Sequence, residues 1–102
     1  MQQLESHIRI NPTSYQNLSV EATLREMIEA LGEPTEKLHY GSDMQYLWRY
    51  EDEDEGFEWE VSDWGENRIR ENDLIAWRVY APSRYTARIA EEFLQNQLAL
   101  VS

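Results

Sequence analysis

Eleven of the twenty carboxylates in this 102-residue chain lie in its middle quarter, and they are the side chains with which the chain could do chemistry. Calcium binding is one such chemistry, because Glu51, Glu53, Glu55 and Gly56 fall at positions 1, 3, 5 and 6 of an EF-hand-like loop. Position 12 of that loop is Ser62 instead of a bidentate glutamate, and the flanking sequences are typical of strands. The acidic run therefore predicts no metal site.

Glu58 and Glu60 have the spacing of a catalytic carboxylate pair. On a strand they would share one face at a separation of about 6.8 Å, close to the separation used by glycosidases. A catalytic acid needs a cleft that raises its pKa, but Phe57, Trp59 and Val61 alternate with these glutamates and predict that the glutamates face solvent. The chain also contains no GxSxG motif and no phosphate-binding glycine loop. We therefore expect a protein that is not an enzyme, with no catalytic residue and no cofactor.

The remaining role for the carboxylates is a charged binding surface. Residues 51–73 carry eleven acids and two arginines, whereas residues 1–50 carry seven acids and four bases, and residues 74–102 carry two acids and three arginines. Acidity that only keeps a protein soluble would be spread over every exposed face, so the clustering predicts a site for a cationic protein. The predicted partner-binding residues are Glu51, Asp52, Glu53, Asp54, Glu55, Glu58, Glu60, Asp63, Trp64, Glu66, Glu71 and Asp73. Trp64 is included as an interface anchor, because tryptophan is common among binding hot spots.

The spacing of these acids bears on the kind of partner. B-DNA carries one charge per about 1.7 Å of axis, whereas one face of a strand offers one per about 6.8 Å. Glu58 and Glu60 alone are therefore too sparse to imitate DNA, and the 51–55 turn and the 65–73 loop must crowd the same side. With a net charge of −11, direct binding to nucleic acid is disfavoured, because lysine and arginine supply most affinity for phosphates.

Composition also limits the setting of the chain. There is no cysteine, which excludes disulfides and thiolate metal ligands. The first residues lack a basic region followed by an apolar run, and no apolar stretch approaches the roughly 20 residues that span a bilayer. We expect a single domain over residues 1–102 that is cytoplasmic and does not bind a membrane. The sequence leaves the oligomeric state open.

Two helices are predicted from apolar residues at the helical period. The first covers residues 19–31, with Ser19 as its N-cap and Gly32 at its C-terminal end. The second covers residues 84–99 and begins after Ser83 as its cap.

Strands are predicted from alternating apolar and polar residues. A hairpin spans residues 44–64 around the acidic turn, and a third strand spans residues 74–80. Residues 33–43 and 65–73 are interpreted as connectors, and residues 1–18 as either a short edge strand or a loosely docked arm.

These elements give the order α-β-β-β-α, with a fourth strand if the N-terminal segment joins the sheet. An antiparallel sheet with one charged face needs cover on one face only. The predicted fold class is therefore α+β, a two-layer sandwich in which two helices lie on one face of an antiparallel sheet of three or four strands. Trp48 and Trp59 of the hairpin are predicted to form the floor of its core.

The segment from residue 31 to residue 64, LGEP…YGSDMQYLWRYEDEDEGFEWEVSDW, resembles small acidic proteins of phages and mobile elements. In those proteins a helix ending in LGxP is followed by a YxWxxE strand, an acidic turn and a strand closing in a DW-like pair. The resemblance covers about a third of the chain and matches no particular inhibitor family. Such proteins include inhibitors of CRISPR and restriction enzymes, and no functional residue is carried over from them.

The charge pattern and the resemblance together predict a non-enzymatic, phage-encoded inhibitor in the host cytoplasm. It would block the basic nucleic-acid-binding surface of a host defence nuclease complex, in the manner of an anti-CRISPR protein or a DNA mimic. Three alternatives stay open. They are an immunity protein that neutralises a nuclease toxin with the same face, a small metal-dependent enzyme, and an assembly subunit whose acidity only keeps it soluble.

Overall fold

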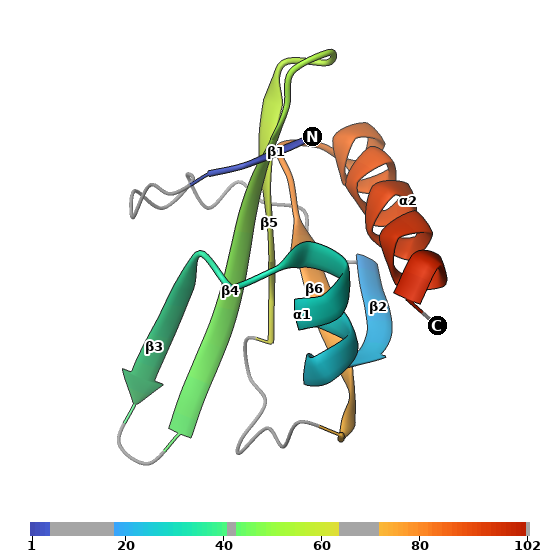
Figure 1. The fold of residues 1–102 in the computed structure, drawn as a ribbon. Helices are drawn as coiled ribbons and strands as arrows, with labels where there is room; N and C mark the ends of the chain where they lie inside the picture. The colour runs from blue at the N-terminus through green and yellow to red at the C-terminus, as the bar shows by residue number, and fades with distance from the viewer. Residues whose placement is uncertain (5–17, 41–42, 64–71, 102) are drawn as a thin grey trace.

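The computed structural model describes residues 1–4, 18–40, 43–63 and 72–101. These residues form one six-stranded antiparallel sheet and two α-helices (Figure 1). The elements in chain order are β1 (Gln2–Gln3), β2 (Leu18–Thr23), α1 (Leu24–Leu31), β3 (Glu36–Tyr40), β4 (Asp43–Asp52), β5 (Phe57–Ser62), β6 (Leu74–Tyr80) and α2 (Arg84–Val101). The α+β class is confirmed, but the described residues contain six strands instead of three or four.

The strands run in the order β1-β4-β5-β6-β2, and β3 also pairs with β4. β1 and β3 both lie along the edge of β4 that faces away from β5. Thr35 fills the junction between them, because its Oγ1 accepts a hydrogen bond from the Arg49 N–H at 3.0 Å and donates one to the Leu4 carbonyl at 3.1 Å. β3 lies within residues 33–43, which the sequence predicts to be a connector, and its pairing with β4 extends the sheet.

Both helices pack against the same face of the sheet, as predicted, and share one core with it. Trp48 meets Trp77 edge to face with ring centroids 5.4 Å apart, and Tyr50 stacks on Trp59 at 5.1 Å. Phe93 of α2 closes over Trp59 at 5.9 Å. The rest of this core comes from Val20, Ala22, Leu24, Met27, Leu31, Phe57, Val61, Val79, Ala81, Ala87, Ala90 and Leu94.

Two hydrogen bonds fix the end of α1 on β4. The Trp48 Nε1–H donates to the Gly32 carbonyl at 3.0 Å, and the Tyr50 hydroxyl donates to the Leu31 carbonyl at 2.9 Å. The last carbonyls of a helix have no partner within the helix, so Tyr50 satisfies a carbonyl of the buried Leu31 that would otherwise lack one, and Trp48 holds the adjoining C-cap residue. Burial raises the pKa of Tyr50 to about 12.

The predicted helix over residues 19–31 is wrong at its start, because residues 18–23 form β2 and the helix begins at Leu24. Thr23 is the N-cap. Its Oγ1 accepts the Glu26 N–H at 3.1 Å, and the Glu26 carboxylate accepts the Thr23 N–H at 3.0 Å. This reciprocal arrangement is a capping box, and Ser19 lies four residues before it, on the strand.

The other predicted elements agree more closely with the structure. The hairpin is formed by β4 and β5, and the third predicted strand coincides with β6. Ser83 caps α2, since its Oγ accepts the Thr86 N–H at 3.2 Å. The observed order is β-β-α-β-β-β-β-α, and most of the predicted N-terminal arm lies outside the described residues. Within the described chain, neither helix is both long and apolar enough to cross a membrane.

Candidate functional site: the β4–β5 hairpin

The β4–β5 hairpin carries most of the predicted acidic surface and extends past the rest of the sheet (Figure 1). β4 and β5 pair from Leu47 opposite Ser62 to Asp52 opposite Phe57. β6 pairs with β5 only up to Glu60. The outer part of the hairpin therefore has no pairing with β6 and reaches solvent at its end.

Asp52 holds the turn at this end. Its Oδ1 accepts hydrogen bonds from the N–H groups of Asp54 and Glu55, each at 3.0 Å, and its carbonyl accepts the Gly56 N–H at 2.8 Å. Gly56 has a φ of 71°, in the left-handed region that glycine adopts without a steric penalty. Asp52 is itself buried, so its carboxylate shapes the turn and is not offered to solvent.

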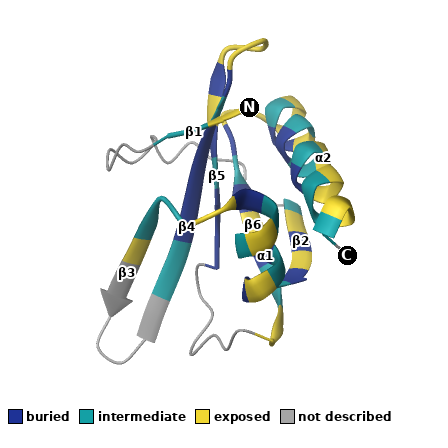
Figure 2. Ribbon diagram, viewed as in Figure 1, coloured by how far each residue is buried: buried dark blue, intermediate teal, exposed yellow. Residues whose placement is uncertain are grey.

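The exposed carboxylates gather around this turn. Glu53, Asp54 and Glu55 are exposed on the turn, which is yellow in Figure 2, and Glu58 is exposed on β5 directly opposite the half-buried Glu51 of β4. Like charges directly opposite each other weaken an antiparallel pair. We call these five residues the acidic tip. It presents negative charge around the turn, and the repulsion between Glu51 and Glu58 weakens the strand pairing beneath it.

Glu60 has a different role, although the sequence groups it with Glu58. It lies opposite Arg49 across the β4–β5 pair, and its Oε1 is 3.3 Å from the Arg49 Nε. The Arg49 side chain is 1 % exposed and the Glu60 side chain 18 %. A buried arginine requires an anionic partner because desolvating an unpaired charge is costly. Glu60 therefore neutralises Arg49 within the sheet.

Tyr80 adjoins this ion pair, since it lies opposite Glu60 on the neighbouring strand. Burial raises the pKa of the Tyr80 hydroxyl, Arg78 lowers it, and the negative charge of Glu60 raises it further. Ser62 also interacts with the hydroxyl. Arg49, Glu60, Ser62 and Tyr80 therefore form a polar network in the middle of the sheet, and Glu60 is engaged in it.

Asp63 is fully buried. Its Oδ1 accepts the Tyr46 N–H of β4 at 2.8 Å, which continues the strand pairing by one side-chain bond beyond Ser62. A partner protein has no access to this carboxylate in the folded chain, so its role is to fix the open end of the hairpin.

Asp73 is exposed but lies at the other end of the sheet, directly before β6. Arg78 of β6 pairs with Ser62, and the residues of β6 that precede Arg78 lie progressively farther from the acidic tip. At about 3.3 Å per residue along β5 and β6, Asp73 lies roughly 30 Å from the turn. Trp64, Glu66 and Glu71 lie outside the described residues. Among the residues that the structure describes, the predicted acids therefore separate into the five of the tip, three that are engaged within the fold (Asp52, Glu60 and Asp63) and the distant Asp73.

Sequence reasoning missed the buried Arg49–Glu60 pair and the strand β2, whose outer edge pairs with no other described strand. A four-residue turn over residues 53–56 places Arg49 opposite Glu60, so the pair follows once the turn is fixed. The start of α1 could have been found from Thr23 and Glu26, which have the T-x-x-E spacing of a capping box.

The described residues contain no group of three His, Asp or Glu side chains placed to hold a metal ion. Searches of protein-family models, curated proteins and solved structures found nothing similar to this chain. The arrangement of the hairpin itself is therefore the basis for a functional proposal.

Proposed function

We propose that this protein is a non-enzymatic inhibitor that inserts its acidic tip into a basic, nucleic-acid-binding site of another protein. The observation that carries the proposal is the set of three consecutive exposed carboxylates, Glu53, Asp54 and Glu55, on a turn held by the buried Asp52. A preorganised turn loses little conformational entropy on binding, so more of its electrostatic attraction contributes to affinity.

The distribution of charge favours a compact pocket over a long groove. Glu60 and Asp63 are engaged inside the fold, and Asp73 lies at the far end of the sheet. The acidic tip alone then replaces a few neighbouring phosphates, not the continuous charge of a duplex. A site that grips the backbone of one short nucleic-acid segment with arginine and lysine is the partner surface that this tip fits.

The resemblance of residues 31–64 to small acidic phage proteins supports a more specific proposal. The partner would be a host defence nuclease complex, such as a CRISPR effector or a restriction enzyme, and the inhibitor would act in the host cytoplasm. An immunity protein would use the same tip against a nuclease toxin. The nuclease whose cleavage is blocked distinguishes these two roles.

The proposal is tested with a tip variant and a control of equal charge change. The tip variant is Glu53→Gln, Asp54→Asn and Glu55→Gln; the control is Glu29→Gln, Glu33→Gln and Glu92→Gln, which are exposed acids outside the hairpin. Both are assayed for inhibition of DNA cleavage by purified CRISPR effectors, restriction enzymes and nuclease toxins. Partners retained from bacterial lysate are also challenged with competing duplex DNA.

Three exposed ion pairs, at about 0.2–1 kcal/mol each, correspond to roughly a 3- to 140-fold change in Kd. We expect the tip variant to lose affinity in this range and the control to bind normally, with the wild-type on-rate falling as salt rises. Equal binding by the two variants, or partners that competing DNA does not release, would show that the acidic tip is not a nucleic-acid decoy.

A further inference from the structure

β2 is the terminal strand of the sheet, at the end opposite β1. All six of its residues, Leu18–Thr23, are in antiparallel register with β6. In the described part of the chain no strand pairs with its other edge. An uncovered strand edge presents a row of main-chain donors and acceptors that a further strand can use.

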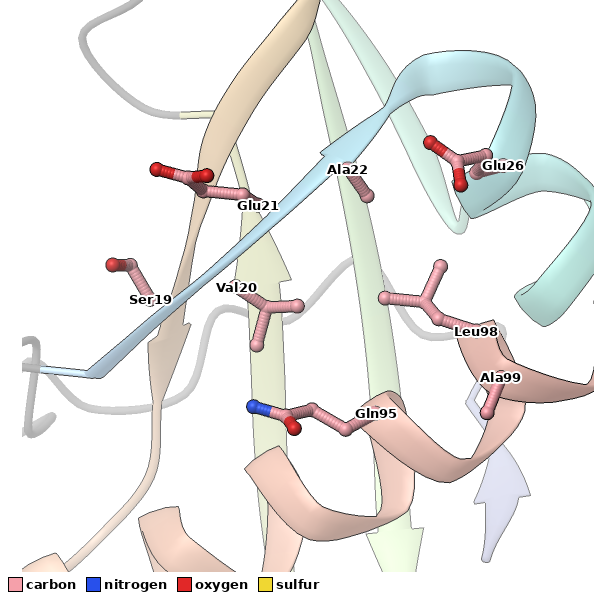
Figure 3. Close-up of a pocket in the computed structure, with 8 residues that line it drawn as sticks. All are labelled: Ser19, Val20, Glu21, Ala22, Glu26, Gln95, Leu98 and Ala99. Atoms are coloured by element: carbon pink, nitrogen blue, oxygen red, sulfur yellow. The ribbon is translucent and has the colours of Figure 1, made fainter. Parts of the chain in front are cut away.

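A groove of about 390 Å³ runs beside this edge (Figure 3). One wall is made by residues 19–22 of β2, and Gln95, Leu98 and Ala99 of α2 form the other. Figure 3 shows Val20 and Ala22 pointing toward α2, while Ser19 and Glu21 point to the opposite side. Successive side chains of a strand alternate in this way, so a groove on one face of the sheet would contact only every second residue. This groove contacts four consecutive residues, which indicates that it follows the edge of β2 and that the main chain forms its wall.

The chemistry of the groove is apolar inside and acidic at its rim. Val20 and Ala22 are buried and Leu98 is half-buried, whereas Glu21 is exposed and Glu26 is half-buried. One oxygen of Glu26 accepts the Thr23 N–H, which orients the carboxylate. In the residues described, no arginine or lysine forms an ion pair with either glutamate.

Two arginines close to the rim in sequence or in strand register are engaged elsewhere. Arg25 pairs with Glu29 at 3.4 Å, and Arg78, which lies opposite Ser19, interacts with the Tyr80 hydroxyl. The rim of the groove therefore keeps its negative charge available for a positive group supplied by a ligand.

We propose that this groove binds an extended segment of a partner protein as an added strand on β2. The segment pairs its main chain with the edge of β2 and places alternate apolar side chains against Val20, Ala22 and Leu98. A lysine or arginine of the same segment lies beside Glu21 or Glu26. Main-chain pairing supplies affinity and the side-chain positions supply specificity, as in other cases of β-strand addition.

A second copy of this chain is a poorer occupant than a basic partner. Pairing β2 with itself across a two-fold axis would bring Glu21 of both copies to one interface. Each copy also carries a net charge of −11, which opposes association. A cationic segment meets neither penalty.

The groove is separate from the acidic tip, because β6 lies between β2 and the hairpin. The inference therefore does not depend on the proposed inhibitory function. The two surfaces can be tested against each other with single charge reversals, since Glu21→Lys and Glu58→Lys change the net charge equally and lie on different strands.

The probe is a blocked peptide in which valine alternates with lysine and threonine. Two comparison peptides carry either glutamate in place of lysine or N-methyl groups on the alternate main-chain nitrogens that face β2. Binding is measured by calorimetry, and the site by NMR shifts and slowed hydrogen exchange of amides 19–22. We expect the unmodified peptide to protect these amides, and both comparison peptides to bind at least about tenfold more weakly.

Glu21→Lys should weaken binding at least about tenfold, whereas Glu58→Lys should leave it unchanged. Ala99→Arg, which fills the groove from the side of α2 without altering β2, should give the same loss as Glu21→Lys. Equal binding of the N-methylated peptide, shifts at the acidic tip in place of β2, or no binding would overturn the proposal. Self-association in sedimentation that Glu21→Lys relieves would also overturn it, because the occupant would then be a second copy.

Discussion

Replacing Tyr50 by phenylalanine separates one buried hydrogen bond from the packing around it. The Tyr50 hydroxyl donates to the Leu31 carbonyl at 2.9 Å, and the phenylalanine ring can keep the stacking on Trp59 at 5.1 Å. A hydrogen bond contributes about 0.5–1.5 kcal/mol, and leaving its buried acceptor unsatisfied costs about 1–3 kcal/mol. We expect Tyr50→Phe to lower the free energy of unfolding by about 1–2 kcal/mol at pH 8.

The same substitution should change the alkaline stability. The pKa of Tyr50 is raised by burial from 10.0 to about 12, so the folded state holds this proton at pH values where the unfolded chain has released it. Its stabilising contribution is complete below pH 10 and is lost as the pH rises toward 12. The pKa difference corresponds to at most about 2.7 kcal/mol, and solvent screening reduces the expected loss to about 1–2 kcal/mol.

The assay is urea denaturation of the wild type and Tyr50→Phe at pH 8, 10 and 11.5, with Tyr85→Phe as the control. Tyr85 is 65 % exposed, so its substitution should have little effect at any of these values. The difference in unfolding free energy between the wild type and Tyr50→Phe should shrink as the pH rises. A difference that stays constant from pH 8 to 11.5 would refute the claim that folding raises the pKa of Tyr50.

Two further substitutions test the structural roles assigned to acids of the hairpin. Asp52→Ala removes the acceptor of two turn N–H groups and should cost about 1–2 kcal/mol of stability. Faster hydrogen exchange at the amides of Asp54 and Glu55 would locate the loss in the turn, and unchanged exchange there would contradict the role assigned to Asp52. Glu60→Gln removes the charge opposite the buried Arg49 and should cost about 1.5–3 kcal/mol in thermal or chemical denaturation. Glu58→Gln is the matched control on the same strand and should be neutral or slightly stabilising, because it relieves the repulsion from Glu51.

The sequence by itself determined the elements whose signals are local. The alternation of Phe57, Trp59 and Val61 predicted which face of β5 is buried, and Ser83 marked the start of α2. β6 was predicted with its observed bounds, because its period of two does not also fit a helix. The exposed carboxylates of residues 53–55 follow in the same way, since a polar run between two strands reads as a turn.

Only the tertiary structure decided between alternatives that local patterns allow equally. Val20 and Leu24 are four residues apart, a spacing that suits one face of a helix and one face of a strand. Pairing with β6 made residues 18–23 a strand, and β3 formed because β4 offered it a free edge. The first outcome depends on hydrogen bonds to residues distant in the chain, and the second on pairing with the strand that follows directly in sequence.

The same distinction separates the acids of the hairpin. Glu58 and Glu60 look alike in sequence, but Arg49 lies opposite one of them and Glu51 opposite the other. Asp63 looks like a surface acid until the Tyr46 N–H is placed beside it. Sequence fixes how much charge a segment carries, whereas burial and cross-strand neighbours decide which of that charge is used within the fold and which remains for a partner.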